Sequence, residues 1–161
     1  LNDQLCMEKL TPEGKRYAAL SRVEARVVGD LLSFMGERSP TKVLTIASEA
    51  EILAQMRDMQ TFFPAEQVHI TRSKPYFLEF SHPLATKGRA LEHLAGHYGI
   101  PREAVMAVGD GYNDLDMIEY AGLGVMMANA REEVKRYADY VTGSNDADGV
   151  AEAVERFVLG G

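Results

Sequence analysis

The clearest chemical signal in this chain is a group of acidic residues that follows an apolar segment. Residues 104–109 (AVMAVG) have the composition of a buried strand, and the acidic sequence GDGYND begins at its last residue. Asp110 falls at the strand end, Gly111 lets the backbone turn, and Asp114 falls in the first turn of the next helix. Two carboxylates gathered there would hold a hard divalent cation, either directly or through water.

A structural role also fits part of this group. Asn113 is a good helix N-cap, and Asp114 and Asp116 would complement the dipole of the helix that follows. For Asp116 the structural role is favoured, because positions two apart on a helix point away from each other. For Asp110 a functional role is favoured, since capping does not require a carboxylate at the strand end.

A second signal is Thr86-Lys87-Gly88 at the start of a predicted helix. With Thr86 as the N-cap, Lys87 opposes the helix dipole at a cost of about 0.3–1 kcal/mol. Gly88 costs up to about 1 kcal/mol more relative to alanine. Free amides, a lysine and a glycine that permits close approach suit a phosphate-sized anion. The alternative for Lys87 is an ordinary solvated surface lysine, and its pairing with Asp110 favours the anion site.

The elements that must position these residues alternate regularly from Thr86 onward. Helices are predicted over residues 86–98, 113–121, 130–138 and 149–159, and strands over residues 104–109, 124–128 and 140–142. Short apolar strands alternating with amphipathic helices indicate an α/β fold with a parallel sheet covered on both faces. Ligands in such folds bind beyond the carboxyl ends of the strands, which is where Asp110 falls.

The preceding half has a different pattern. Strands are predicted over residues 42–47, 67–72 and 76–80, with helices over 49–63 and from Thr11-Pro12 onward. The best boundary between the two halves is His82-Pro83. The sequence thus divides into residues 1–82 and residues 83–161.

His93 and His97 imitate a metal site, because they lie four residues apart on a helix, the spacing of two zinc ligands. They lie off the apolar stripe of their helix, and no third ligand is evident. Surface histidines are the favoured interpretation.

The segment around 144–149 (SNDADG) imitates two further sites. With Glu155 it matches a calcium loop at several positions, but its first position is serine and a strand leads into it. Asp148 as the N-cap of the last helix is the better explanation. Asp146 and Asp148 also imitate a phosphatase nucleophile loop, which is rejected because such a loop should end a buried strand.

Composition limits the remaining classes of function. The chain has 161 residues, 46% of them hydrophobic and 25% charged, which is ordinary for a globular protein. Its net charge of −7 argues against nucleic-acid binding and suits a site for a divalent cation. No apolar run approaches the length of a membrane span. A single cysteine, Cys6, excludes an intrachain disulfide and fits a reducing cytoplasm.

Together these segments resemble the haloacid dehalogenase superfamily, specifically its Cof-type, sugar-phosphatase-like branch. The resemblance is carried, in order, by SKPYFLEF, TKGRAL, AVGDGYNDLDMIEYAG, NA, REEVKRYADYVT and NDADGV. It implies a Mg²⁺-dependent phosphatase that acts on small phosphorylated metabolites such as sugar phosphates. It also implies a Rossmann-like core and a mobile α/β cap, with residues 1–82 as part of the cap and 83–161 as the C-terminal part of the core.

The resemblance assigns roles to individual residues. It makes Lys87 the lysine that steadies the nucleophile and the phosphoryl charge. It makes Asp110 the metal-ligating aspartate and Asp114 the second acidic residue of the metal site. Asn113, with Gly111 and Gly88, belongs to the phosphate-side loops.

The chain departs from the family at its start. The family begins with an Asp-x-Asp loop, whose first aspartate attacks phosphorus and whose second acts as acid and base. Residues 1–82 resemble the later part of the cap instead, so this chain resembles the C-terminal portion of a longer protein. It is expected not to hydrolyse phosphate esters alone, and to self-associate or to retain an N-terminal segment.

Two alternatives to a phosphatase remain. The first is a module that binds magnesium or phosphate without turnover. The second is a phosphoacceptor signalling domain, which would need an aspartate on a separate strand that is not found here. Nothing in residues 1–82 identifies the substrate.

Overall fold

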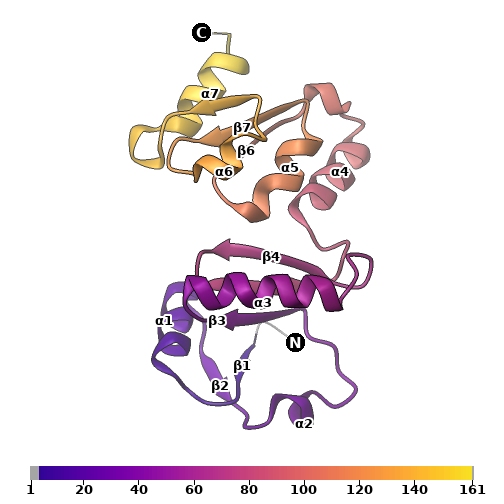
Figure 1. Ribbon diagram of the computed structural model, residues 1–161. Coiled ribbons are helices and arrows are strands. Elements are labelled where there is room, and N and C mark those ends of the chain that lie inside the picture. The colour runs from indigo at the N-terminus through magenta and orange to yellow at the C-terminus, as the bar shows by residue number, and fades with distance from the viewer. Residues whose placement is uncertain (1–3, 161) are drawn as a thin grey trace.

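Three parallel strands form the sheet of the C-terminal part in the computed structural model, which describes residues 4–160 (Figure 1). Their order is β6 (Met106–Gly109), β7 (Leu123–Met127) and β8 (Tyr140–Thr142). The helices around them are α4 (Lys87–Tyr98), α5 (Leu115–Tyr120), α6 (Glu132–Lys135) and α7 (Gly149–Phe157). Short 3₁₀ turns are η1 (Arg102–Ala104), η2 (Tyr112–Asp114) and η3 (Asn145–Ala147). The predicted α/β fold with a Rossmann-like parallel sheet is confirmed.

The core of this part lies around the central strand β7. Val125 and Met126 are fully buried there, because helices pack on both sides of the strand. Helix α5 packs on β6 and β7, and α7 packs on β7 and β8. Figure 1 shows α4 and α5 to the right of the sheet and α7 to its upper left. The continuous apolar sequence of β7 is therefore that of a strand buried on both faces.

Strand β6 lies at the edge of this sheet. Among the described residues it is hydrogen-bonded to β7 alone. The apolar stripe predicted for α4 is only partly buried: Ala95 is in the core, but Leu94 and Tyr98 are 50% and 70% exposed. The reason is that α4 packs mainly on α5, and so only one side of its stripe is covered.

A separate antiparallel sheet forms most of the N-terminal part. Its order is β3 (Lys42–Ile46), β5 (Phe77–Ser81) and β4 (His69–Lys74). Strands β4 and β5 begin within two residues of their predicted starts. The turn between them is Pro75-Tyr76 rather than Ser73-Lys74-Pro75, because Lys74 still pairs with Phe77.

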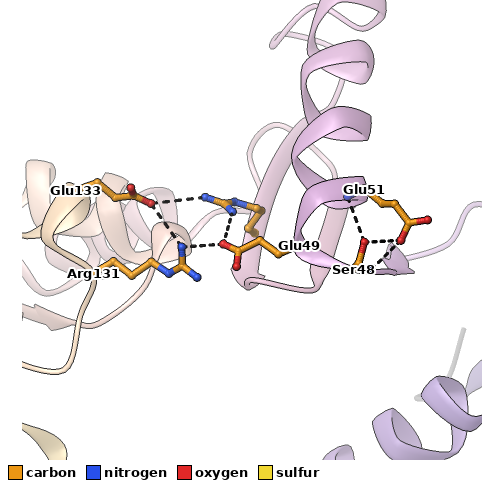
Figure 2. Close-up of polar contacts among 6 residues, drawn as sticks. Ser48, Glu49, Glu51, Arg131 and Glu133 are labelled. Atoms are coloured by element: carbon orange, nitrogen blue, oxygen red, sulfur yellow. Dashed lines mark hydrogen bonds and ion pairs between the residues drawn. The ribbon is translucent and has the colours of Figure 1, made fainter.

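Helix α3 (Glu49–Phe62) packs on this sheet and buries Ile52. It starts at a capping box, in which the backbone N–H of Glu51 donates to the Ser48 hydroxyl and the Ser48 N–H donates to the Glu51 carboxylate at 3.0 Å (Figure 2). The hydroxyl of Ser48 also donates to this carboxylate and lowers the pKa of Glu51. The box fixes the first turn of α3, which carries Glu49.

Three short elements were not predicted. Strands β1 (Leu5–Met7) and β2 (Ala25–Val27) form a parallel pair, and α2 (Leu31–Met35) follows them. Helix α1 (Pro12–Ser21) connects the pair and is capped by Thr11 as expected, with the Gly14 N–H donating to its hydroxyl at 3.0 Å. Among the described residues, no helix is long and apolar enough to cross a membrane.

Candidate active site

Asp110 stands at the carboxyl end of β6, where the sequence placed it, and its side chain is exposed. Its carboxylate accepts a hydrogen bond from the Asn129 side-chain amide at 3.2 Å. The side-chain oxygen of Asn129, Oδ1, in turn accepts a hydrogen bond from the backbone N–H of Asn145 at 2.9 Å. Asn129 follows β7 and Asn145 follows β8, so polar contacts run across the carboxyl ends of all three strands.

Asn129 and Asn145 are site residues to which the sequence analysis gave no role. Both lie in segments that carry the family resemblance, NA and NDADGV. Each also lies shortly after the end of a short apolar strand, as Asp110 does. That repeated position was the signal that could have identified them.

Asp114 folds back over the end of β6 and is 3% exposed. Its Oδ2 accepts the backbone N–H groups of Asp110 and Gly111, both at 2.9 Å. Its Oδ1 accepts a hydrogen bond from Lys87 Nζ. Both oxygens of Asp114 therefore have partners in the chain, and the residue holds Lys87 and the turn after β6 together.

The metal assignment rests most directly on Asp110. Among residues 4–160, no group of three or more histidine, cysteine or acidic side chains is placed to hold a metal ion. The Asp110 carboxylate is exposed, and within the described residues its only side-chain partner is the Asn129 amide. A hard divalent cation prefers such oxygen ligands, so the residue fits Mg²⁺ as one of several ligands. The metal role predicted for Asp114 stays a prediction.

Lys87 is brought next to the acidic turn, as the paired motifs predicted. It is the first residue of α4, which Thr86 caps by accepting the Arg89 N–H at 3.2 Å. Its side chain is about half exposed, at 51%, so its ammonium group is held by Asp114 and still reaches solvent. This leaves a cation on Asp114, the residue that also binds the backbone of the turn after β6.

The expectation for Gly88 was wrong in one respect. Its N–H was predicted to be free for a phosphate, but it donates to the Asp116 carboxylate at 2.8 Å. A Cβ on Gly88 would lie 2.7 Å from the Asp116 backbone, so the glycine permits close packing of α5, and its predicted place in a phosphate-side loop stays a prediction. Asp116 thus complements the dipole of α4, whereas the sequence analysis had assigned it to the dipole of its own helix.

The roles predicted for Asn113 and Gly111 also need correction. Asn113 lies inside η2, and α5 has Asp114 at its N-cap position without a side-chain capping bond. Gly111 has a φ of −132°, which does not require glycine. A Cβ at Gly111 would instead lie 2.8 Å from the Asn113 side-chain oxygen. That oxygen is the end of a flexible side chain and can rotate away, so neither the backbone nor this contact requires glycine at position 111.

The residues that imitate a zinc site, a calcium loop and a nucleophile loop mostly lie where the sequence predicted. His93 and His97 are both exposed. Asp146 is exposed in η3 and does not end a strand. Asp148 occupies the N-cap position of α7, but its side chain makes no capping bond, because its backbone is left-handed with a φ of 52°.

Comparison with known proteins shows which family this chain resembles. Residues 15–154 match the family described as haloacid dehalogenase-like hydrolase. A putative phosphatase of Haemophilus influenzae is 42% identical over 118 residues, covering 73% of this chain and 44% of that protein. The Bacillus subtilis 5-amino-6-(5-phospho-D-ribitylamino)uracil phosphatase YcsE is 40% identical over 109 residues, covering 68% of this chain and 41% of that protein. The chain thus spans less than half the length of these two relatives.

Solved structures show the same similarity. A haloacid dehalogenase-like hydrolase from Bacteroides thetaiotaomicron is 38% identical with a TM-score of 0.71, covering 94% of this chain and 56% of that one. A sugar phosphatase of haloacid dehalogenase subclass IIB is 27% identical with a TM-score of 0.78, and the match covers 94% of this chain and 55% of that one. On the family match, the shared fold and the motifs gathered at the end of β6, this chain belongs to the haloacid dehalogenase superfamily, among its Cof-like hydrolases.

Proposed function

We propose that this chain is the C-terminal portion of a Mg²⁺-dependent phosphatase that acts on small phosphorylated metabolites such as sugar phosphates. The observation that carries the proposal is the pairing of Lys87 with buried Asp114, which also accepts the backbone N–H of Asp110, a residue whose carboxylate is exposed. Residues 1–82 would form part of a cap and residues 83–161 the C-terminal part of the core. The single cysteine, Cys6, is free and supports a cytoplasmic location.

In this proposal each residue has a limited task. Asp114 orients the Lys87 ammonium group, which neutralises negative charge on the transferring phosphoryl group. Asp110 holds the cation, and Asn129 orients the Asp110 carboxylate by donating to it. Mg²⁺, when bound, would supply a second positive charge on the phosphoryl oxygens.

The attack on phosphorus needs a further group. A nucleophile must lie in line with the leaving group, and an acid must protonate that group. Asp114 is occupied by Lys87 and two backbone amides, and Asp146 is exposed in η3 rather than directly at the end of a buried strand. We therefore propose that an Asp-x-Asp segment preceding this chain supplies the attack.

The substrate class is supported by the names of the relatives. They include a sugar phosphatase of subclass IIB, a phosphatase of a phosphoribitylamino-uracil and a phosphoglycolate phosphatase. These substrates share a phosphate on a small polar metabolite and differ in the leaving group. A small phosphorylated metabolite is therefore the class that we propose here.

Phosphatase activity should require the upstream segment. With p-nitrophenyl phosphate and Mg²⁺, we expect no turnover above background for the 161-residue chain and clear turnover for a longer version that carries Asp-x-Asp. Lys87→Ala should lower that turnover, and Asp146→Ala should not. Turnover by the short chain that persists in Asp110→Ala would contradict both the need for an upstream segment and the assignment of Asp110 to the site. Tight Mg²⁺ or phosphate binding without turnover in either version would favour the non-catalytic binding module.

We also propose that the free edge of β6 makes the isolated chain associate. Unpaired strand amides and carbonyls invite pairing, and Leu94 and Tyr98 add exposed apolar surface. Sedimentation velocity should show dimers or larger species as the concentration of the chain rises. Tyr98→Ser should weaken association, whereas Leu32→Ser, which removes an 85% exposed leucine from α2, should not. A monomer at every concentration would contradict this proposal.

A further inference from the structure

Arg72 is a buried cation that the proposed mechanism does not use. It lies on β4 and is only 5% exposed. Strand β4 packs against η2, the turn that follows Asp110, and Figure 1 shows β4 on the side of its sheet that faces the C-terminal part. Arg72 therefore lies where the two parts of the molecule meet.

The guanidinium group of Arg72 stacks over an aromatic ring of the acidic turn. Its Cζ lies 4.0 Å from the ring centroid of Tyr112, which is well within the range of a cation–π contact. Its Nε and Nη1 are buried and make no hydrogen bond within residues 4–160. Such contacts are strongest where water is excluded, as it is here.

Two carboxylates flank this contact at ion-pair distance, without a hydrogen bond to the Arg72 Nη1 atom. Arg72 Nη1 is 3.8 Å from Glu49 Oε1, and Nη2 is 3.9 Å from Glu133 Oε1. Glu49 is held more closely by Arg131, at 2.7 Å, and Figure 2 shows these two side chains facing each other. The hydrogen bond from Arg131 holds the pKa of Glu49 below its ordinary value of 4.5. The carboxylates therefore balance the charge of Arg72, while the ring fixes its position.

Tyr112 connects Arg72 to the site. It follows Asp110 by two residues and precedes Asn113 directly, and its ring packs against the core of the C-terminal part. Any movement of its backbone would move Asp110 and the two amides that Asp114 accepts. We propose that Arg72 is a positioning residue, which clamps Tyr112 and so keeps the turn 109–114 and the Asp110 carboxylate in place. Only the catalytic consequence of this inference rests on the proposed function.

Amide hydrogen exchange in the 161-residue chain tests the clamp without any assay of activity. We expect Arg72→Met to raise the exchange rates of the Asp110 and Gly111 amides by about tenfold, because the turn opens locally when the buried contact is lost. Global stability should stay the same or rise, because a buried charge is replaced by an apolar side chain. Arg72→Lys keeps the charge without the planar group and should raise exchange by about threefold.

A matched control is Lys42→Met, which removes a 3.1 Å ion pair with Glu79 in the same sheet. It should leave the Asp110 and Gly111 amides unchanged. If Arg72→Met does not fold, Arg72→Lys provides the comparison. Unchanged exchange of both amides in the folded Arg72 variants would overturn the inference.

Kinetics separate positioning from direct contact with substrate. In a version with phosphatase activity, Arg72→Met should lower kcat and leave KM unchanged, and Arg72→Lys should restore part of kcat. A raised KM with unchanged kcat would mean that Arg72 binds the substrate itself, which overturns the positioning role. If no version shows phosphatase activity, the proposed function fails, and the exchange experiment still decides the role of Arg72.

Discussion

Asp110→Asn should lower the phosphatase rate by at least about a hundredfold in a version of this protein that carries the attacking segment. Asparagine keeps the size of the side chain and can still accept from Asn129, but it removes the negative charge that holds the cation. Mg²⁺ binding, measured by calorimetric titration, should weaken in parallel. The fold should not change, because the Asp110 side chain is exposed.

The matched control is Asp116→Asn. Asp116 lies six residues further along and accepts the Gly88 N–H through one side-chain oxygen, which asparagine also provides. We expect its rate and its Mg²⁺ affinity to stay close to those of the unchanged protein. Equal losses from the two substitutions would contradict the assignment of Asp110 to the metal.

Gly88→Ala should destabilise the protein by about 1–3 kcal/mol, toward the upper end of that range. The added Cβ would lie 2.7 Å from the backbone carbon and oxygen of Asp116, and a backbone cannot turn away as a flexible side chain can. Helices α4 and α5 would have to separate, and the Gly88–Asp116 hydrogen bond would lengthen. The measurement is the midpoint of urea unfolding.

Gly96→Ala is the control in the same helix. Nothing lies within 4 Å of a Cβ at Gly96, so the substitution should show only the helix propensity of alanine. That preference should stabilise the protein by up to about 1 kcal/mol. If Gly88→Ala and Gly96→Ala changed the stability in the same direction, the contact between α4 and α5 would not determine the effect of Gly88→Ala.

The sequence predicted the C-terminal sheet well because β7 is buried on both faces and its neighbour β6 is equally apolar. Residues 104–109 and 124–128 are apolar without interruption, and a strand of that kind stands out from the amphipathic helices beside it. The placement of Asp110 followed, since the residue after a strand needs no tertiary information. Thr11 and Thr86 were predicted as caps for the same reason, because capping depends on a few adjacent residues.

What the sequence could not predict depends on contacts between distant segments. The bond from Gly88 to Asp116 and the stack of Arg72 on Tyr112 join residues far apart in the chain. Helical spacing described Asp116 correctly within its own helix but carried no information about the neighbouring one. Strands β1 and β2 have three residues each, which is too short for an alternating pattern to emerge.

The close packing of Asp114 over Gly109 limits how this protein can vary. A Cβ at Gly109 would lie 2.5 Å from the Cβ of Asp114, so the acid occupies the volume that a side chain at position 109 would need. A larger residue cannot replace Gly109 without displacing Asp114, the group that holds Lys87. In a mutagenesis library, position 109 should therefore accept only glycine as long as Asp114 is present, while the neighbouring Asp110, whose side chain is exposed, can change its chemistry without disturbing that packing.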